Sequence, residues 1–440
     1  MPVAAPYLGK GALPMNWNQL YGIRSYLKSS LWVVPFIAIP VEFAVAWMLR
    51  AVNARLGWNF LGFSATGSQA MLGALITATM GFVVFTFASL LLAIQVASGQ
   101  LTPRIIATTL LQDKVVSYAA ALFVFTFLFS VSAVGRIDPK VDQLAVFVAA
   151  CLGVACVATV LFLIDYAAKL LRPITILARV GRRGIDVIQS VYPEMNDGLD
   201  PKEAWRDSID PPVRTILHQG ASQIVLAVNV AALMALAERS NGVIEFVPQV
   251  GDFVAVDEPL FNLRGGAASL DDQALRANVA FGPERTMEQD PTFAYRIVVD
   301  LALKALSPAI NDPTTAVLAI DQLHRLLRVV GMRRLRTDGI LDKSGRLRVI
   351  VPTPNWADFV HLAFTEIRYC GSNNVQIVRR MRAMIENLMQ TLPRHRQPVL
   401  QQQLAALDRE MEKHFDMAED LMLARIPDSQ GLGGRSGELR

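Results

Sequence analysis

The polar residues that look most capable of chemistry form a short turn that reads Asn-Asp-Pro-Thr-Thr from residue 311. The turn offers an amide, a carboxyl and two hydroxyls where a helix begins, and backbone N–H groups at a helix start can hold an anion. Helix capping is the alternative, because Asp is a preferred N-cap residue and Pro is favoured at the first helical position. The candidate ligand turn comprises Asn311, Asp312, Thr314 and Thr315.

A carboxyl group also lies within strongly apolar sequence. Glu42 stands near the middle of the apolar run 31–49, two residues after Pro40. A carboxylate there costs about 3 kcal/mol on insertion scales, whereas each surrounding Leu, Ile, Val or Phe contributes about −0.3 to −0.6 kcal/mol, so the segment still inserts. Two interpretations are open. Glu42 lines a pathway or carries a proton, or it is a protonated or paired carboxyl packed between helices.

Small and polar residues share one helical face of the next apolar run, 70–96. They recur at spacings of four or seven and are Gly73, Thr77, Gly81, Ala88 and Gln95. Small residues four apart let another helix approach closely, and further hydroxyls on the opposite face, including Thr86, place this helix inside a bundle. The helix either lines a pathway or packs tightly with its hydroxyls bonded to its own backbone. The candidate pathway or packing residues are Glu42, Thr77, Thr86 and Gln95.

The sequence lacks the motifs of common enzymes and cofactor-binding proteins. It contains no phosphate-binding Gly-x-x-x-x-Gly-Lys loop, no Gly-x-Gly-x-x-Gly after a strand, no Gly-x-Ser-x-Gly elbow and no His-Glu-x-x-His. Its three cysteines form no Cys-x-x-Cys pair, and its five histidines are scattered. We therefore expect no catalytic residues, no cofactor and no metal. An enzyme acting on a lipid-soluble substrate would have only Asp165 and Asp312 as candidate reactive groups.

Four apolar stretches must position these residues, and they cover 31–49, 70–96, 115–134 and 144–164. Each is long enough as a helix to cross a hydrocarbon core of roughly 30 Å, which takes about 20 residues. A surface helix of a soluble protein needs a polar face, which these stretches lack. The sequence predicts a polytopic α-helical membrane protein, with a four-helix transmembrane domain followed by a mixed α/β, mostly helical cytosolic domain.

The distribution of Lys and Arg predicts the orientation of these spans. Ten of these residues flank the spans on the side that holds both termini, against four on the other side. The positive-inside rule therefore places both termini in the cytoplasm. The net charge is only +4, with the excess beside the apolar stretches, so we expect a lipid bilayer as partner and no nucleic acid.

The changes in composition along the chain predict five regions. They are a cytosolic N-terminal segment at 1–29, the four-span domain at 30–165, a juxtamembrane helix and linker at 166–212, the α/β domain at 213–425 and a disordered tail at 426–440. Within the α/β domain, alternation predicts strands over 216–228, 243–247, 253–256 and 347–351. A turn joins the strands over 243–247 and 253–256, and a hairpin turn at 342–345 precedes the last strand. Capping patterns, with Asn229 and Asp290 as N-caps, predict helices over 229–240, 291–306, 313–331, 355–368, 373–391 and 395–425. The helix over 373–391 has a Met-rich stripe, which indicates a core face or a recognition groove, and Arg379, Arg380 and Arg382 lie off it.

Three sequence stretches carry a family resemblance. Residues 85–104 read FTFASLLLAIQVASGQLTPR, residues 251–260 read GDFVAVDEPL and residues 300–316 read DLALKALSPAINDPTTA. In this order they resemble an uncharacterised family of bacterial predicted membrane proteins, domain of unknown function 2254, and the resemblance covers about residues 20–425. It implies a bacterial inner-membrane protein, and it implies no known activity and no catalytic residues.

These features favour a homo-oligomeric channel or transport-type protein with a cytosolic gating or assembly domain. Four helices in one chain enclose little space, so a conduit needs several copies around an axis. The alternative is a membrane-anchored sensor or scaffold, in which the spans only anchor the chain and the cytosolic domain binds a partner. The sequence names neither a transported species nor a ligand.

Overall fold

The computed structural model describes residues 16–30, 32–56, 62–100, 114–137, 141–170, 172–196, 209–335 and 338–433. The chain divides into two compact units. The helical unit comprises Leu27–Val180 together with Lys304–Leu318. The remaining described residues form the α/β unit.

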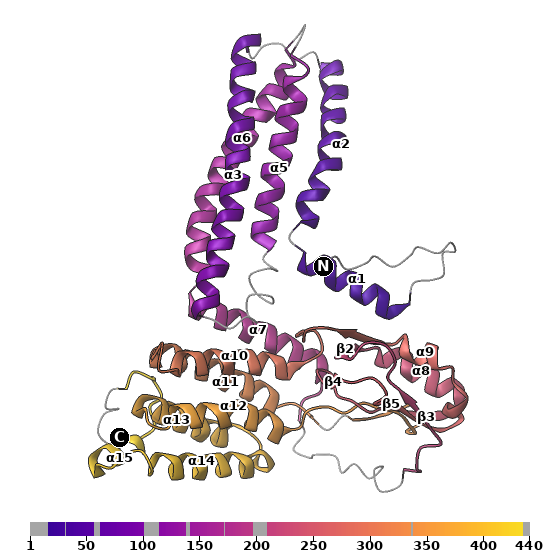
Figure 1. Ribbon diagram of the computed structural model, residues 1–440, viewed down its shortest axis with the longest axis vertical. Helices are drawn as coiled ribbons and strands as arrows, with labels where there is room; N and C mark the ends of the chain where they lie inside the picture. Colours follow the sequence, from indigo (N-terminus) through magenta and orange to yellow (C-terminus); the bar gives the residue numbers. More distant parts are fainter. Residues whose placement is uncertain are drawn as a thin grey trace. The chain divides into compact units, whose positions relative to one another are not determined.

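Long apolar helices build the helical unit, as Figure 1 shows. Among the described residues, four helices are long and apolar enough to cross a membrane. They are α2 (Val33–Leu56), α3 (Ala65–Gln100), α5 (Lys114–Val134) and α6 (Gln143–Leu170). These helices confirm the four predicted apolar segments, and α5 packs against each of the other three.

The helical unit has a small-residue interior and a large apolar exterior. Ala149 and Cys156 are fully buried between helices, and Gly153 of α6 lies so close to α3 that a Cβ there would be 2.4 Å from Leu75 Cδ2. Large side chains such as Trp47 of α2 and Leu161 of α6 are exposed instead. A soluble surface rarely exposes such a continuous apolar area, so this distribution fits helices that meet lipid.

Strands of the α/β unit form, within the described residues, a five-stranded sheet in the order β1-β5-β3-β8-β7 and a three-stranded sheet in the order β4-β2-β6. The strands are β1 (Arg214–Leu217), β2 (Gln223–Val228), β3 (Gly242–Phe246), β4 (Phe253–Val254), β5 (Pro259–Gly265), β6 (Val279–Gly282), β7 (Gly339–Leu341) and β8 (Leu347–Ile350). Strands β3 and β4, which we expected as neighbours across a turn, belong to different sheets. Strand β3 pairs with β5 and β8 instead, and its pairing with β8 is parallel.

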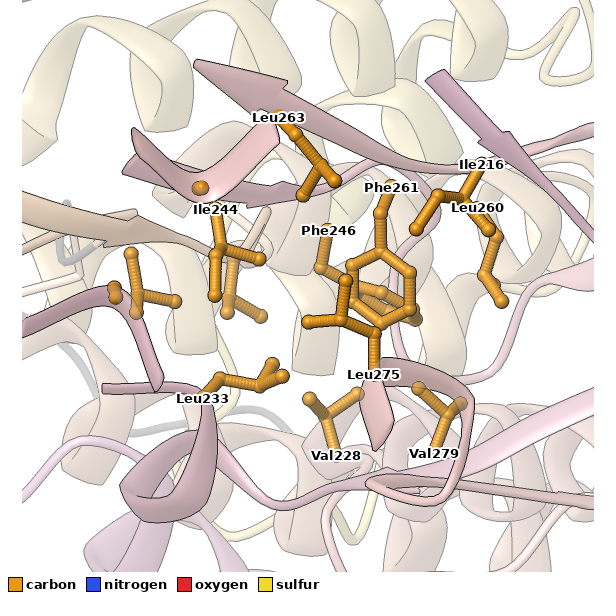
Figure 2. Packing of buried hydrophobic residues seen from close by; sticks show 14 of the residues in the cluster. Ile216, Val228, Leu233, Ile244, Phe246, Leu260, Phe261, Leu263, Leu275 and Val279 are labelled. Atoms are coloured by element: carbon orange, nitrogen blue, oxygen red, sulfur yellow. The ribbon is translucent and has the colours of Figure 1, made fainter. Parts of the chain in front are cut away.

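Alternating residues of these strands build one apolar core. Figure 2 shows Ile244 and Phe246 of β3 packed with Phe261 and Leu263 of β5. Leu275 of the short helix α9 (Asp272–Arg276) completes the cluster. Because side chains alternate across a strand, the residues between these positions lie on the opposite face of the sheet.

Helices make up the rest of the chain. They are α1 (Trp17–Ser29), α7 (Pro173–Val191), α8 (Val230–Ser240), α10 (Pro291–Leu306), α11 (Pro313–Gly331), α12 (Trp356–Gly371), α13 (Val375–Thr391), α14 (Gln397–Met411) and α15 (Ala418–Ala424). The predicted caps are confirmed, because Asn229 accepts a hydrogen bond from Ala232 N and Asp290 accepts one from Phe293 N. The single helix predicted over 395–425 was wrong, since α14 and α15 are separate helices.

The segment after α15 differs from the predicted disorder over its described part, residues 426–433. Asp428 accepts hydrogen bonds from the backbone N–H groups of Gln430, Gly431 and Gly433. Arg379 of α13 donates to the carbonyl oxygens of Ile426 and Gly433. Polar bonds to α13 therefore hold a segment that has no apolar pattern of its own, and residues 434–440 lie outside the described residues.

Candidate functional site

Glu42 lies inside the helical unit. Its side chain is only 1% exposed, and among the described residues its Oε1 has no hydrogen-bond partner. Pro40 lies within the same helix, one half-turn earlier. Burial of Glu42 is expected under both interpretations, because a proton carrier and a packed carboxyl would each be buried between helices.

The polar residues of α3 separate onto two faces. Thr86 is buried and donates to Phe82 O at 2.7 Å, whereas Thr77 is exposed and donates to Gly73 O at 3.1 Å. Gln95 is exposed as well. Within one chain, Thr77 and Gln95 are therefore exposed, whereas Glu42 is buried. Both threonine hydroxyls thus bond to backbone oxygens of their own helix.

The small-residue face of α3 lies on the outside of the helical unit, and our placement of it in the bundle interior was wrong for a single chain. Gly73, Thr77, Gly81 and Ala88 are all exposed. A Cβ built on Gly73 or Gly81 meets no atom within 4 Å among the described residues. The open face therefore has room for a further helix.

Thr86 also lines an apolar cavity of about 240 Å³ between α3, α5 and α6. The walls include Thr86, Ser89, Leu90, Val116, Leu163 and Tyr166. Hydroxyl groups are few among these side chains, and the Thr86 hydroxyl is bonded to its own helix. The cavity suits an apolar group better than a hydrated ion.

The candidate ligand turn is largely explained by capping. The carboxylate of Asp312 accepts hydrogen bonds from Thr315 N at 3.0 Å and from Thr315 Oγ1 at 2.5 Å. Asn311 has a φ of +47°, a left-handed conformation that Asn tolerates. Asn311 and Thr314 are exposed, so they remain the two side chains of the turn that capping does not engage.

A cavity of about 580 Å³ lies in the α/β unit. Its apolar lining includes Trp17, Val228, Val250, Pro291, Ile340 and Pro354. Its polar lining includes Asn229, Gln289, Asp290 and Thr353. The volume falls within the range of small-molecule sites, and an apolar lining with a few polar groups is typical of them. Sequence reasoning assigned Asn229 and Asp290 only to caps, because the lining comes from segments far apart in the chain.

Asp290 is the buried acid of this cavity. Its Oδ1 accepts from Phe293 N at 3.1 Å and from Thr292 Oγ1 at 2.5 Å, and its Oδ2 lies 3.1 Å from Arg285 Nε. Burial raises the pKa of the Asp290 carboxyl above its ordinary value of 3.8, and the Arg285 guanidinium opposes that rise. The charged form is therefore less favoured in the folded protein than in the unfolded chain.

We expect this acid to make stability depend on pH. The pKa of the Asp290 carboxyl is higher in the folded protein than in the unfolded chain. Its contribution to the free energy of unfolding is therefore complete below about pH 4 and is lost as the pH rises through the pKa of the folded protein. Asp290→Asn should therefore lose less stability than the wild type between about pH 4 and neutrality, as measured by denaturant unfolding. Asp416→Asn, at an exposed position, is the control and should follow the wild type. Parallel pH profiles for all three proteins would contradict the expectation.

The described residues contain no cluster of potential metal ligands. In the part of the chain that the structure describes, no three His, Cys, Asp or Glu side chains are grouped so that they could hold a metal ion. The described features are thus an exposed helix face, a buried carboxyl and several cavities.

Comparison with known sequences identifies the family. Residues 28–387 match the sequence model of the predicted membrane proteins named DUF2254. The chain belongs to the DUF2254 family. Uncharacterized proteins of Mycobacterium bovis (strain ATCC BAA-935 / AF2122/97) and Mycobacterium tuberculosis (strain ATCC 25618 / H37Rv) are similar to this DUF2254 protein at 26% identity over 422 residues. Each alignment covers 90% of this chain and 79% of the relative, and no solved structure matches.

Proposed function

We propose that this DUF2254 protein is a homo-oligomeric channel or transport-type protein of the bacterial inner membrane. Both termini would face the cytoplasm, and the α/β unit would act as the gating or assembly domain. The observation that carries the proposal is the exposed small-residue face at the N-terminal half of α3, formed by Gly73, Thr77 and Gly81.

This face is poorly suited to lipid and well suited to a helix. Gly at two of three positions buries little apolar surface against acyl chains but permits close backbone approach by another helix. Other exposed positions of the same helix, such as Val84 and Leu91, are large and apolar. A second copy of the chain offers the same face, and self-association around an axis is the commonest form of protein assembly.

Glu42 supports a transport role within such an assembly. Ionisable side chains within membrane-spanning helices are rare and often mark ion or proton pathways. The Glu42 carboxyl is buried, and its Oε1 has no hydrogen-bond partner in the described part of the chain. The excess of Lys and Arg beside the spans on the side of both termini supports the cytoplasmic orientation.

Cysteine cross-linking tests the proposal. In a full-length protein with Cys151 and Cys370 replaced by alanine, Thr77→Cys should form disulfide-linked dimers under mild oxidation in membranes. Ala158→Cys, on the exposed side of α6, is the matched control and should cross-link far less. Reconstitution into liposomes should give ion or proton flux that Glu42→Gln lowers. A monomer without cross-links or flux would overturn the proposal.

The second candidate is a membrane-anchored sensor, which the cavity of about 580 Å³ in the α/β unit favours. Trp17 lines this cavity and belongs to α1, which precedes the first candidate span in the chain. Ligand-dependent change in Trp17 fluorescence, absent in Trp17→Phe, combined with no flux in liposomes would favour the sensor over the channel.

A further inference from the structure

Two arginine side chains flank one valine on the face of the five-stranded sheet that lies away from its apolar core. Arg264 of β5 pairs in register with Val243 of β3. Arg348 of β8 stands beside Val243 on the other side, because the next residues, Val349 and Ile244, are register partners. Figure 2 shows Ile244 and Leu263, the neighbours of this row, in the core on the opposite face.

The strand spacing sets the distance between the two arginines. Neighbouring strands lie about 4.8 Å apart, so the Cα atoms of Arg264 and Arg348 are separated by roughly 10 Å with only Val243 between them. Two guanidinium groups on one face of the sheet at this separation can both donate hydrogen bonds to a single ligand group that lies between them.

Both guanidinium groups are buried and only partly used. Arg264 is 9% exposed. Its Nη1 lies 2.8 Å from Glu245 Oε2, and its Nε donates to Asp210 O at 2.6 Å. Arg348 is 5% exposed. Its Nε donates to Asp342 Oδ2 at 2.8 Å, and its Nη1 donates to Gly242 O at 3.4 Å. Among the described residues, no hydrogen bond engages the Nη2 atom of either arginine. Both arginines line one cavity, so these N–H groups can donate to an acceptor that enters it.

A cavity of about 280 Å³ opens between these side chains. Its lining comprises Ile209, Asp210, Asn241, Gly242, Val243, Arg264, Gly265, Leu347 and Arg348. Gly265 has a φ of +58°, a left-handed conformation that favours glycine, and Gly242 lines the cavity with backbone only. The carboxylates of Glu245 and Asp342 hold the arginines in place. These carboxylates also neutralise the charge of the two arginines, so recognition would depend on the direction of the N–H groups more than on net charge.

We propose that this cavity binds a phosphate group, either free phosphate or the phosphate of a small metabolite, between Arg264 and Arg348. The planar guanidinium fork matches the oxygen atoms of a phosphate and can donate two parallel hydrogen bonds. The site does not depend on the oligomer or on the channel, because all its residues belong to the α/β unit of one chain.

Binding of inorganic phosphate to the full-length protein in detergent tests this site. Calorimetry and thermal unfolding should show binding of inorganic phosphate that chloride at equal ionic strength does not reproduce. Arg348→Lys keeps the charge beside Asp342 but removes the fork, and it should weaken phosphate binding at least about tenfold. Arg346→Lys is the matched control, because Arg346 also pairs with Asp342 but is 64% exposed at its side chain and does not line the cavity.

A second variant distinguishes loss of the binding site from misfolding of the protein. Val243→Phe fills the space between the two arginines without removing either, and it should abolish phosphate binding while the thermal unfolding transition persists. Glucose 6-phosphate that binds more tightly than inorganic phosphate would identify a metabolite, whereas weaker binding would identify the free ion. No phosphate-specific binding by the wild type, or unchanged binding by both Arg348→Lys and Val243→Phe, would overturn the site and leave two structural ion pairs.

Discussion

Replacing Gly81 with leucine is expected to dissociate the proposed oligomer into monomers in mild detergent. A Cβ at Gly81 meets no atom within 4 Å among the described residues, so the substitution leaves the packing inside one chain unchanged. A leucine side chain would, however, hold a second helix away from the face formed with Gly73 and Thr77. Self-association should weaken about tenfold or more, which corresponds to about 1.4 kcal/mol, as measured by light scattering across a dilution series.

The control for this prediction adds the same side chain elsewhere on the helical unit. Ala158→Leu enlarges an exposed position of α6 and should leave the oligomer intact. Equal loss of association in both variants would indicate a general effect of bulk at the membrane surface. Full association of Gly81→Leu would show that α3 does not form the interface.

Replacing Arg379 with methionine is expected to lower the free energy of unfolding of the α/β unit by about 1–3 kcal/mol, the range for leaving a hydrogen-bond acceptor in the folded protein without its partner. Arg379 is 0% exposed, and it donates to Ile426 O at 3.0 Å and to Gly433 O at 3.1 Å. Methionine preserves much of the apolar stem but supplies no donor, so these partly buried carbonyl oxygens would lose their charged partner. Denaturant unfolding of the full-length protein measures the loss.

The matched control is an arginine on a neighbouring helix. Arg409 of α14 is exposed, and Arg409→Met should change the free energy of unfolding by less than about 0.5 kcal/mol. Hydrogen exchange adds a local measurement, because the backbone N–H groups of Gly431 and Gly433 should exchange faster in Arg379→Met. If Arg379→Met unfolds like Arg409→Met, the bonds to the C-terminal segment contribute little to stability.

Helix starts and tight turns could be predicted because their chemistry is local. Asn229 and Asp290 each cap the helix that follows them through a bond to the third residue ahead. The Asp342–Gly345 turn between β7 and β8 was predicted on the same basis, and Asp342 O accepts from Gly345 N at 2.9 Å. A few neighbouring residues contain all the donors and acceptors involved, so no tertiary information was needed.

The candidate sites could be predicted only in part. The residue types of α3 left open whether its hydroxyls line a pathway or bond to their own helix. Whether Gly81 faces a neighbour or the outside depends on how α5 and α6 pack. The arginines of α13 were expected off the Met-rich stripe, yet Arg379, Arg380 and Arg382 are buried. Their burial depends on α14, α11 and the C-terminal segment, which supply Asp408, Asp321 and the carbonyl acceptors.

Four apolar helices, their order before an α/β region, and the caps and turns of that region could all be predicted from local sequence, because hydropathy and capping depend on residues that are close together in the chain. Long-range packing was needed to show which face of α3 stays open, that β3 lies between β5 and β8, and that Arg264 and Arg348 share one cavity. Such partners are distant in sequence, and their meeting depends on strand register and long-range packing, which no local pattern encodes.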